Sequence, residues 1–145
     1  EHYLLAKKGK NLCPYPPITG EHELKIPGEN ELGRWKVNTS VIRGNQVGGD
    51  IAPLICYLDL AKITTGLVMR SRQPGDRFVP MGMRTEKKIK DYLIDARVPR
   101  SWRDNIPVIV CDDEVVWLAG YRIDDGFKVT ADTKNMLRIE MTCIS

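Results

Sequence analysis

Apolar and polar residues alternate in several short runs of this chain, which is the pattern of strands that bury one face. The clearest run is 33–42, where Trp35, Val37 and Thr39 lie between charged or amide side chains. Similar runs predict further strands at His22–Ile26, Ile55–Leu60, Gly66–Arg72, Lys128–Thr130 and Leu137–Thr142. The chain is therefore predicted to be rich in β-structure.

A hairpin is predicted in the C-terminal half. Val108–Cys111 and Glu114–Ala119 are strand-like runs separated only by Asp112 and Asp113, a connection typical of a tight β-turn. No strand–helix–strand pattern repeats, so we expect an α+β fold with antiparallel strands and not a doubly wound parallel sheet.

Two other segments have the composition of turns. Gly44–Asp50 is rich in Gly and predicts a hairpin or mobile loop, and no Lys-Ser/Thr pair follows it as a phosphate loop would require. In Pro74-Gly75-Asp76, Gly75 suits a positive φ and Asp76 suits orienting the turn. Helices are not expected in the Pro- and Gly-rich segment 1–30.

One helix is predicted, beginning near Thr85 as its N-cap and ending before Pro99. Its apolar face would carry Ile89, Tyr92, Leu93 and Ala96. That spacing is typical of a helix packed on a core. A short helical turn is expected next, at Ser101–Asn105.

Charge is distributed unevenly along the chain. Residues 70–103 contain ten Lys/Arg and four Asp/Glu, whereas the remainder contains twelve and fifteen. This concentration predicts a surface that attracts a polyanion such as RNA. The alternative is a solvated, salt-bridged exterior.

Three of these cations, Arg84, Lys87 and Lys88, would gather at the first turn of the predicted helix. Cations are unfavourable there because the helix dipole is positive at that end. We therefore expect a phosphate site formed by backbone N–H groups and these side chains, the alternative being that the side chains extend into water.

Length and composition suit one domain spanning residues 1–145, because a chain of 145 residues with 42% hydrophobic residues can bury its own core. The four cysteines form no C-x-x-C pair, so neither a zinc site nor any other metal site is predicted, and the thiols are expected to be free, apolar strand residues. No signal-like or membrane-spanning run occurs, which makes the cytoplasm the expected compartment.

An ordered set of motifs runs through residues 57–142. They are RSRxPGDRF at 70–78, PMGM at 80–83, KKIKD at 87–91, VPR at 98–100, RDxIP at 103–107 and WLAGYRID at 117–124. These residues resemble the C-terminal region of the tRNA(Ile)-lysidine synthetase family. The resemblance covers a core at 54–145 and is thin over the β-type region 1–53.

The resemblance implies a layered α+β domain with a β-sandwich, similar to a domain of the phenylalanyl-tRNA synthetase β chain. It implies a non-catalytic part that grips the body or acceptor stem of tRNA(Ile), while an N-terminal catalytic domain uses ATP and magnesium to attach lysine to the wobble cytidine. The family's Ser-Gly-Gly-x-Asp-Ser loop is absent from these residues. No catalytic residue and no cofactor are therefore predicted on this chain.

The predicted RNA contacts are the basic residues of the 70–103 segment that suit backbone recognition of an A-form helix. They are Arg70, Arg72, Arg77, Arg84, Lys87, Lys88, Lys90, Arg100 and Arg103. The competing hypothesis is a module that dimerises the enzyme through strand edges or apolar strands, with little RNA contact. A small-molecule hydrolase is disfavoured because no nucleophile, base and orienting group can be nominated.

Overall fold

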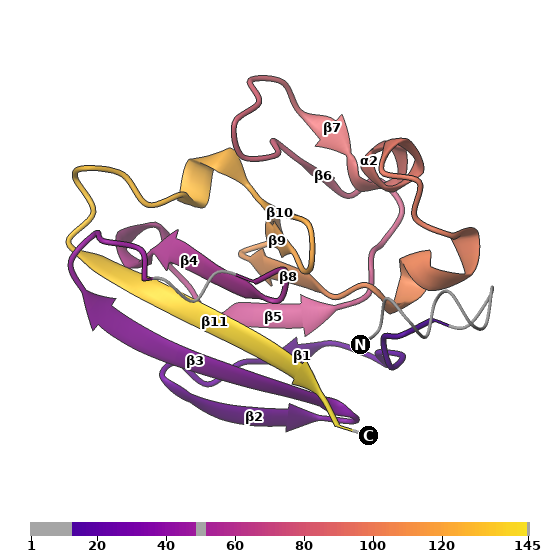
Figure 1. Ribbon diagram of the computed structural model, residues 1–145, viewed down its shortest axis with the longest axis horizontal. Coiled ribbons are helices and arrows are strands. Elements are labelled where there is room, and N and C mark those ends of the chain that lie inside the picture. The colour runs from indigo at the N-terminus through magenta and orange to yellow at the C-terminus, as the bar shows by residue number, and fades with distance from the viewer. Residues whose placement is uncertain (1–12, 49–51, 145) are drawn as a thin grey trace.

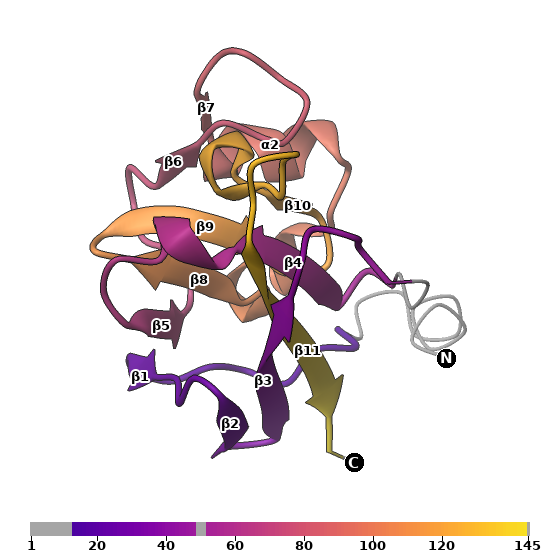
Figure 2. The same cartoon turned by 90° about the vertical axis from the view of Figure 1, so that its left-hand side faces the viewer.

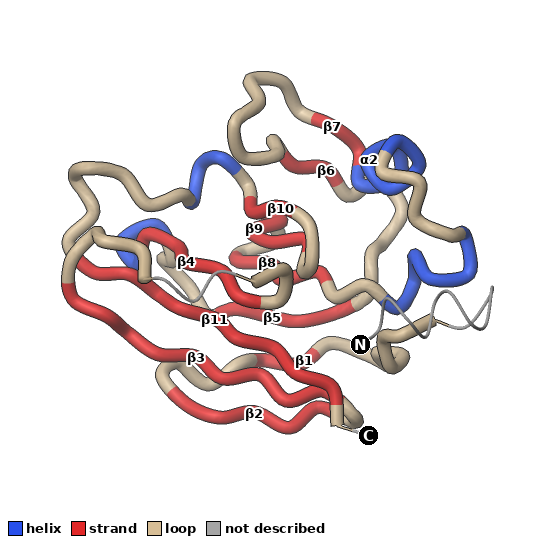
Figure 3. Tube along the Cα trace, viewed as in Figure 1, coloured by secondary structure: helices blue, strands red, loops and turns tan. Residues whose placement is uncertain are grey.

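Two antiparallel β-sheets face each other in the computed structural model, which describes residues 13–48 and 52–144 (Figure 1). The first sheet has the order β1-β5-β8-β9-β10, formed by His22–Glu23, Leu67–Arg70, Val108–Cys111, Glu114–Leu118 and Arg122–Ile123. The second has the order β2-β3-β11-β4, formed by Gly28–Leu32, Trp35–Arg43, Asn135–Cys143 and Ile55–Asp59. The predicted antiparallel α+β architecture is confirmed, and strands dominate the trace in Figure 3.

The central strand of the second sheet is β11, which pairs with β3 on one side and β4 on the other. The register places Cys143 opposite Trp35 and Asn135 opposite Arg43. Along β3, the residues predicted to face inward, Trp35, Val37 and Thr39, are buried. The alternation read from the sequence is therefore the burial pattern of the strand.

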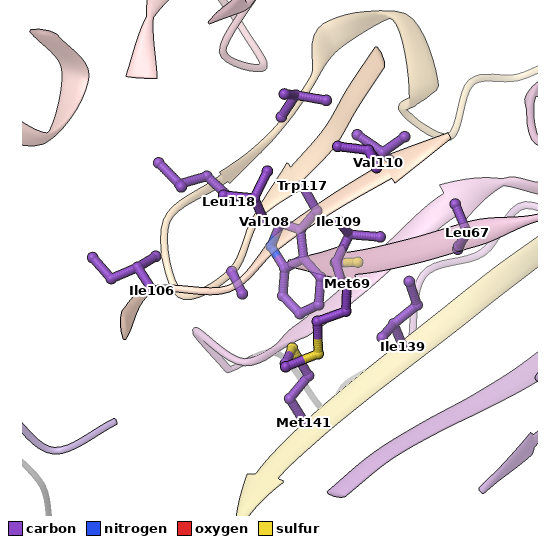
Figure 4. Close-up of a cluster of buried hydrophobic side chains, with 14 of the residues drawn as sticks. Leu67, Met69, Ile106, Val108, Ile109, Val110, Trp117, Leu118, Ile139 and Met141 are labelled. Carbon is purple, nitrogen blue, oxygen red and sulfur yellow. The ribbon is translucent and has the colours of Figure 1, made fainter. Parts of the chain in front are cut away.

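The core lies between the two sheets. Figure 4 shows Ile139 and Met141 of β11 pointing toward Met69, Ile109 and Trp117 of the opposite sheet, and all five side chains are buried. Trp35 is also fully buried, and its Nε1 donates to the carbonyl of Pro16 at 3.0 Å. The described residues thus contain the hydrophobic core that the composition predicted.

A smaller layer lies beside the sandwich (Figures 1 and 2). It contains the strand pair β6 (Arg77–Phe78) and β7 (Lys87–Lys88), the helix α2 (Ile89–Asp95) and the 3-10 helix η2 (Arg100–Asn105). Helix α2 buries Ile89 and Leu93, and Tyr92 meets Phe78 edge-on with ring centroids 5.4 Å apart. The remaining 3-10 turns are η1 (Leu60–Lys62) and η3 (Asp125–Phe127).

The predicted start of the helix is wrong. The helix begins at Ile89, and Lys88, its N-cap residue, has extended backbone and no capping side-chain bond. Lys87 and Lys88 belong to β7, so they do not form a helical first turn, and Arg84 lies in the preceding loop. The predicted cluster of three cations in a helical first turn is therefore wrong. Ala96, predicted to lie on the apolar face of the helix, is exposed at the C-cap.

Other predicted elements also need correction. Residues 128–130 form no strand, and β2 was not predicted. The 44–50 segment does not join neighbouring strands, because β3 and β4 lie on opposite sides of β11, and Gly49 and Asp50 lie outside the described residues. The predicted strand at 22–26 is reduced to β1, because the chain bends at Ile26 and Pro27.

The predicted hairpin is confirmed. Strands β8 and β9 pair antiparallel around Asp112 and Asp113, whose φ angles are 50° and 65°. Two positive φ values in a two-residue loop define a type I′ turn, which matches the twist of the flanking strands. Cys111, at the end of β8, is a buried free thiol as predicted.

Among the other cysteines, Cys56 is buried in β4, Cys13 is half-buried before the first strand and Cys143 is exposed at the end of β11. No group of three His, Cys, Asp or Glu side chains within residues 13–48 and 52–144 could hold a metal ion. Over the same residues, no helix is long and apolar enough to cross a membrane.

Candidate nucleic-acid interface

The basic segment begins with a buried ion pair. Arg70, the last residue of β5, donates from Nη1 to Asp76 Oδ2 at 2.8 Å and from Nη2 to Asp76 Oδ1 at 3.0 Å. Arg70 Nη1 also donates to the carbonyl of Ser71 at 2.9 Å. These bonds neutralise the guanidinium and fix the 70–76 turn to the end of the strand.

Asp76 orients this turn, as predicted. Its Oδ2 accepts a bond of 2.7 Å from the backbone N–H of Gln73, and Gly75 has a φ of 87°, a conformation that disfavours other residues. The carbonyl of Asp76 accepts from the N–H of Ile89, the first residue of α2, at 2.9 Å. The turn and the start of the helix are therefore held together.

A cavity of about 510 Å³ lies where the turn meets the helix. Its basic lining comes from Arg72 on the turn and from Lys88 and Lys90 at the start of α2. Both lysines are exposed, and neither pairs with a carboxylate of the described residues. Three cations from two segments thus face one hollow, which is an arrangement suited to an anionic group.

A second hollow, of about 440 Å³, continues from Lys88 along β7 and α2. Here two of the three lining cations are paired: Arg77 Nη1 lies 3.7 Å from Glu86 Oε1, and Lys87 Nζ pairs with Asp95. Lys87 Nζ also lies 5.9 Å from the ring centroid of Tyr92. These contacts make the second hollow less positive than the cavity around Arg72.

The loop that carries Arg84 is attached to the far end of the first sheet. Asp124 accepts from the N–H of Val79 at 2.9 Å, and Asp125 accepts from the N–H of Gly82 at 3.1 Å. The bond from Gly82, together with the one from Lys128 Nζ, holds the pKa of the Asp125 carboxyl below its ordinary value. This anchoring fixes the base of the loop, while Arg84 itself is exposed.

The structure separates the predicted contacts into groups. Arg70 is buried against Asp76, and Arg103 is half-buried with its Nε donating to the carbonyl of Val98 at 3.1 Å. Both arginines therefore bond to the scaffold of the domain, and RNA contact by them stays a prediction. The exposed members of the predicted set are Arg77, Arg84, Lys88, Lys90 and Arg100. RNA binding by these and by the partly exposed Arg72 and Lys87 stays a prediction.

Sequence reasoning missed Asp104, a carboxylate that lines the cavity together with Asp76. Asp104 Oδ1 accepts from Arg72 Nε at 3.0 Å, although the residues are far apart in the chain. The signal available was the Arg103-Asp104 step at the end of the basic segment, but only the folded chain brings η2 next to the 70–76 turn. Glu86, another carboxylate of this layer, pairs instead with Arg77 beside the β6–β7 pair.

Comparisons with known proteins agree with this description. A family model described as the TilS substrate C-terminal domain matches residues 67–141, just over half of the chain. The tRNA(Ile)-lysidine synthase of Dehalococcoides mccartyi strain CBDB1 is 41% identical over 142 residues, which are 97% of this chain and 30% of that protein. The tRNA(Ile)-lysidine synthase of Caldanaerobacter subterraneus subsp. tengcongensis is 41% identical over 121 residues, covering 82% and 26%.

Two solved structures share the fold. The first, "Crystal structure of TILS C-terminal domain", has a TM-score of 0.71 at 22% identity and covers 87% of this chain and 98% of that one. The second is an N-terminal fragment of the phenylalanyl-tRNA synthetase β-subunit from Pyrococcus horikoshii, with a TM-score of 0.59 at 14% identity, covering 72% and 38%. The predicted likeness to both folds is confirmed.

The fold and its basic cavity define a layered, strand-rich α+β domain with a positively charged surface on one side layer. Together with the family match, they identify the chain. It belongs to the TilS substrate C-terminal domain family. The chain spans about 30% or less of the length of the curated relatives named above.

Proposed function

We propose that this chain is the non-catalytic C-terminal part of a tRNA(Ile)-lysidine synthase and that it binds and positions tRNA(Ile) through the body or acceptor stem. The observation that carries the proposal is the convergence of Arg72, Lys88 and Lys90 on one cavity. The names of the relatives indicate tRNA(Ile) as the substrate. The three cations of the cavity are suited to binding the phosphates of its backbone.

The proposed role is to identify and hold the tRNA at a distance from the reaction. Phosphate contacts fix the register of an RNA without reading its bases. Binding energy gathered away from the reacting atoms can raise the rate when it orients the substrate. We assign the reaction itself, which uses ATP, magnesium and lysine, to the catalytic domain of the full-length protein, which we place in the cytoplasm. The signature loop of that domain does not occur in these residues.

The test is made in the full-length protein with Arg72→Gln, Lys88→Gln and Lys90→Gln combined. We expect kcat/KM for intact tRNA(Ile) to fall at least about tenfold, which corresponds to about 1.4 kcal/mol, while modification of an isolated anticodon stem–loop is unchanged. The matched control is Lys62→Gln with Lys134→Gln, two exposed lysines outside the basic layer. Equal losses on both substrates would contradict the proposal.

A second candidate function is contact with another copy of the chain. Met81 and Met83 are 46% and 39% exposed, and Met81 borders a groove of about 550 Å³ that Tyr121 and Ile123 also line. Exposed methionines beside an apolar groove favour a protein contact. Sedimentation separates the two functions, because an apolar dimer would persist at high salt whereas RNA binding would not.

A further inference from the structure

The pair formed by Arg72 and Asp104 joins two segments of the basic layer at the edge of the cavity. Arg72 Nε lies 3.0 Å from Asp104 Oδ1, with the arginine side chain 24% exposed and the aspartate side chain 78% exposed. The carboxylate is therefore in contact with solvent and with the cation at once. An exposed pair of this kind contributes little to stability and opens easily.

Hydrogen bonds to other parts of the chain hold both segments that carry the pair, the turn with Arg72 and the 3-10 helix with Asp104. The turn carrying Arg72 is fixed by the pair of Arg70 with Asp76 and by the Ser71 hydroxyl, which donates to the carbonyl of Ile18 at 3.3 Å. The 3-10 helix carrying Asp104 is fixed by Asn105, whose Nδ2 donates to the carbonyl of Tyr15 at 3.3 Å. The side chains can exchange partners while these supports stay in place.

The surroundings of the pair are basic. Lys88 and Lys90 line the same cavity without a carboxylate partner among the described residues, and the Asp76 carboxylate is already satisfied by Arg70. Asp104 is thus the carboxylate that pairs with the guanidinium of Arg72. A phosphate group of RNA offers oxygen acceptors to the guanidinium as the carboxylate does, and it would also be attracted by the two lysines.

We propose that the cavity bounded by Arg72, Lys88, Lys90 and Asp104 binds a single phosphate group of RNA, and that the Asp104 carboxylate holds the place of this phosphate on Arg72 until RNA displaces it. This proposal rests on the proposed RNA-binding function and names the site and the competing group. This proposal and a scaffold role for Asp104 predict opposite effects of Asp104→Asn on the affinity for RNA. Removing a competitor raises the affinity, whereas removing a support lowers it.

The experiment measures the affinity of the 145-residue chain for tRNA(Ile) in a double-mutant cycle of Arg72→Gln and Asp104→Asn. We expect Asp104→Asn to tighten binding about threefold to tenfold at low salt and Arg72→Gln to weaken it about tenfold. In the Arg72→Gln background, Asp104→Asn should have only the small effect of a lost surface charge, because no guanidinium remains to be released. The thermal midpoint should not change in either single variant.

The matched control for charge is Asp91→Asn, an exposed carboxylate of α2 that lines the neighbouring hollow. Removing any negative charge near bound RNA strengthens binding slightly, so the gain from Asp104→Asn must exceed the gain from Asp91→Asn. An equal gain, or weaker binding by Asp104→Asn, would overturn the competition. Absence of salt-dependent tRNA binding by the unmutated chain would instead overturn the proposed function.

The source of the phosphate is resolved with two RNA samples, one with a 5′-phosphate and one with a 5′-hydroxyl. A gain from Asp104→Asn with both samples identifies an internal phosphodiester, and a gain with the 5′-phosphorylated sample alone identifies the terminal phosphate. Either result supports the site. No gain with either sample contradicts it.

Discussion

Arg70 and Asp76 form a two-point ion pair in which both side chains are largely removed from solvent, with exposures of 8% and 12%. The carboxylate is also bonded to the N–H of Gln73 at 2.7 Å, so one side chain holds the strand end and the turn. The positions of Arg72 and of the start of α2 follow from this pair. The shape of the proposed phosphate site therefore depends on residues that lie beneath it.

Replacing Asp76 with Ala should be strongly destabilising. It leaves the Arg70 guanidinium buried without a counter-charge, and breaking a buried pair in this way costs about 3–5 kcal/mol. Urea unfolding should show this loss. Arg72→Gln, which breaks the exposed pair with Asp104, should change the free energy of unfolding by less than about 1 kcal/mol. Similar effects for the two variants would show that Arg70 and Asp76 are not a buried support.

The hairpin between β8 and β9 can be improved. Asp112 and Asp113 both adopt positive φ, a conformation that Asn and Gly accept more easily than Asp does. Asp112→Asn with Asp113→Gly should raise the free energy of unfolding by about 0.5–1 kcal/mol, read as a higher thermal midpoint. A lower midpoint would indicate that the two carboxylates make a stabilising contribution of their own.

Tyr15 should make the fold sensitive to alkali. Burial, with smaller contributions from Tyr121, Cys143 and Cys13, raises its pKa from 10.0 to about 12. The stabilising contribution of the neutral phenol is complete below pH 10 and is lost as the pH rises through about 12, because the unfolded chain releases the proton first. Denaturant unfolding at increasing pH should show this decline, and Tyr15→Phe should flatten it. An unchanged slope in the variant would refute the assignment.

The sandwich could be predicted where one physical pattern dominates. Trp35, Val37 and Thr39 show alternation because β3 buries one face, and Asp112-Asp113 marks a tight turn between two apolar runs. The helix start could not be predicted, because Thr85 suits an N-cap as well as a loop, and pairing of Lys87 and Lys88 with β6 overrides local propensity. Strand β2 lacks alternation of apolar residues and depends on its partner β3.

The sequence predicts which segment carries the candidate site, but it does not predict how the side chains of that segment are arranged in space. Charge counting finds residues 70–103, and the motif resemblance finds the family, but neither distinguishes Arg70, which is buried, from Lys90, which is exposed. The pairing of Arg72 with Asp104 depends on how η2 packs beside the 70–76 turn. Such contacts between distant segments leave no local pattern in a single sequence.

The most direct test of the central claim is the salt dependence of tRNA(Ile) binding by the 145-residue chain and by its Lys88→Gln, Lys90→Gln variant. The account predicts that log K falls linearly with log salt, and that the double variant binds more weakly with a slope smaller by about one unit, because the two lysines share the single phosphate of the proposed cavity. The control variant Lys62→Gln, Lys134→Gln should keep the original slope. Identical slopes for the unmutated chain and the Lys88→Gln, Lys90→Gln variant would contradict the account.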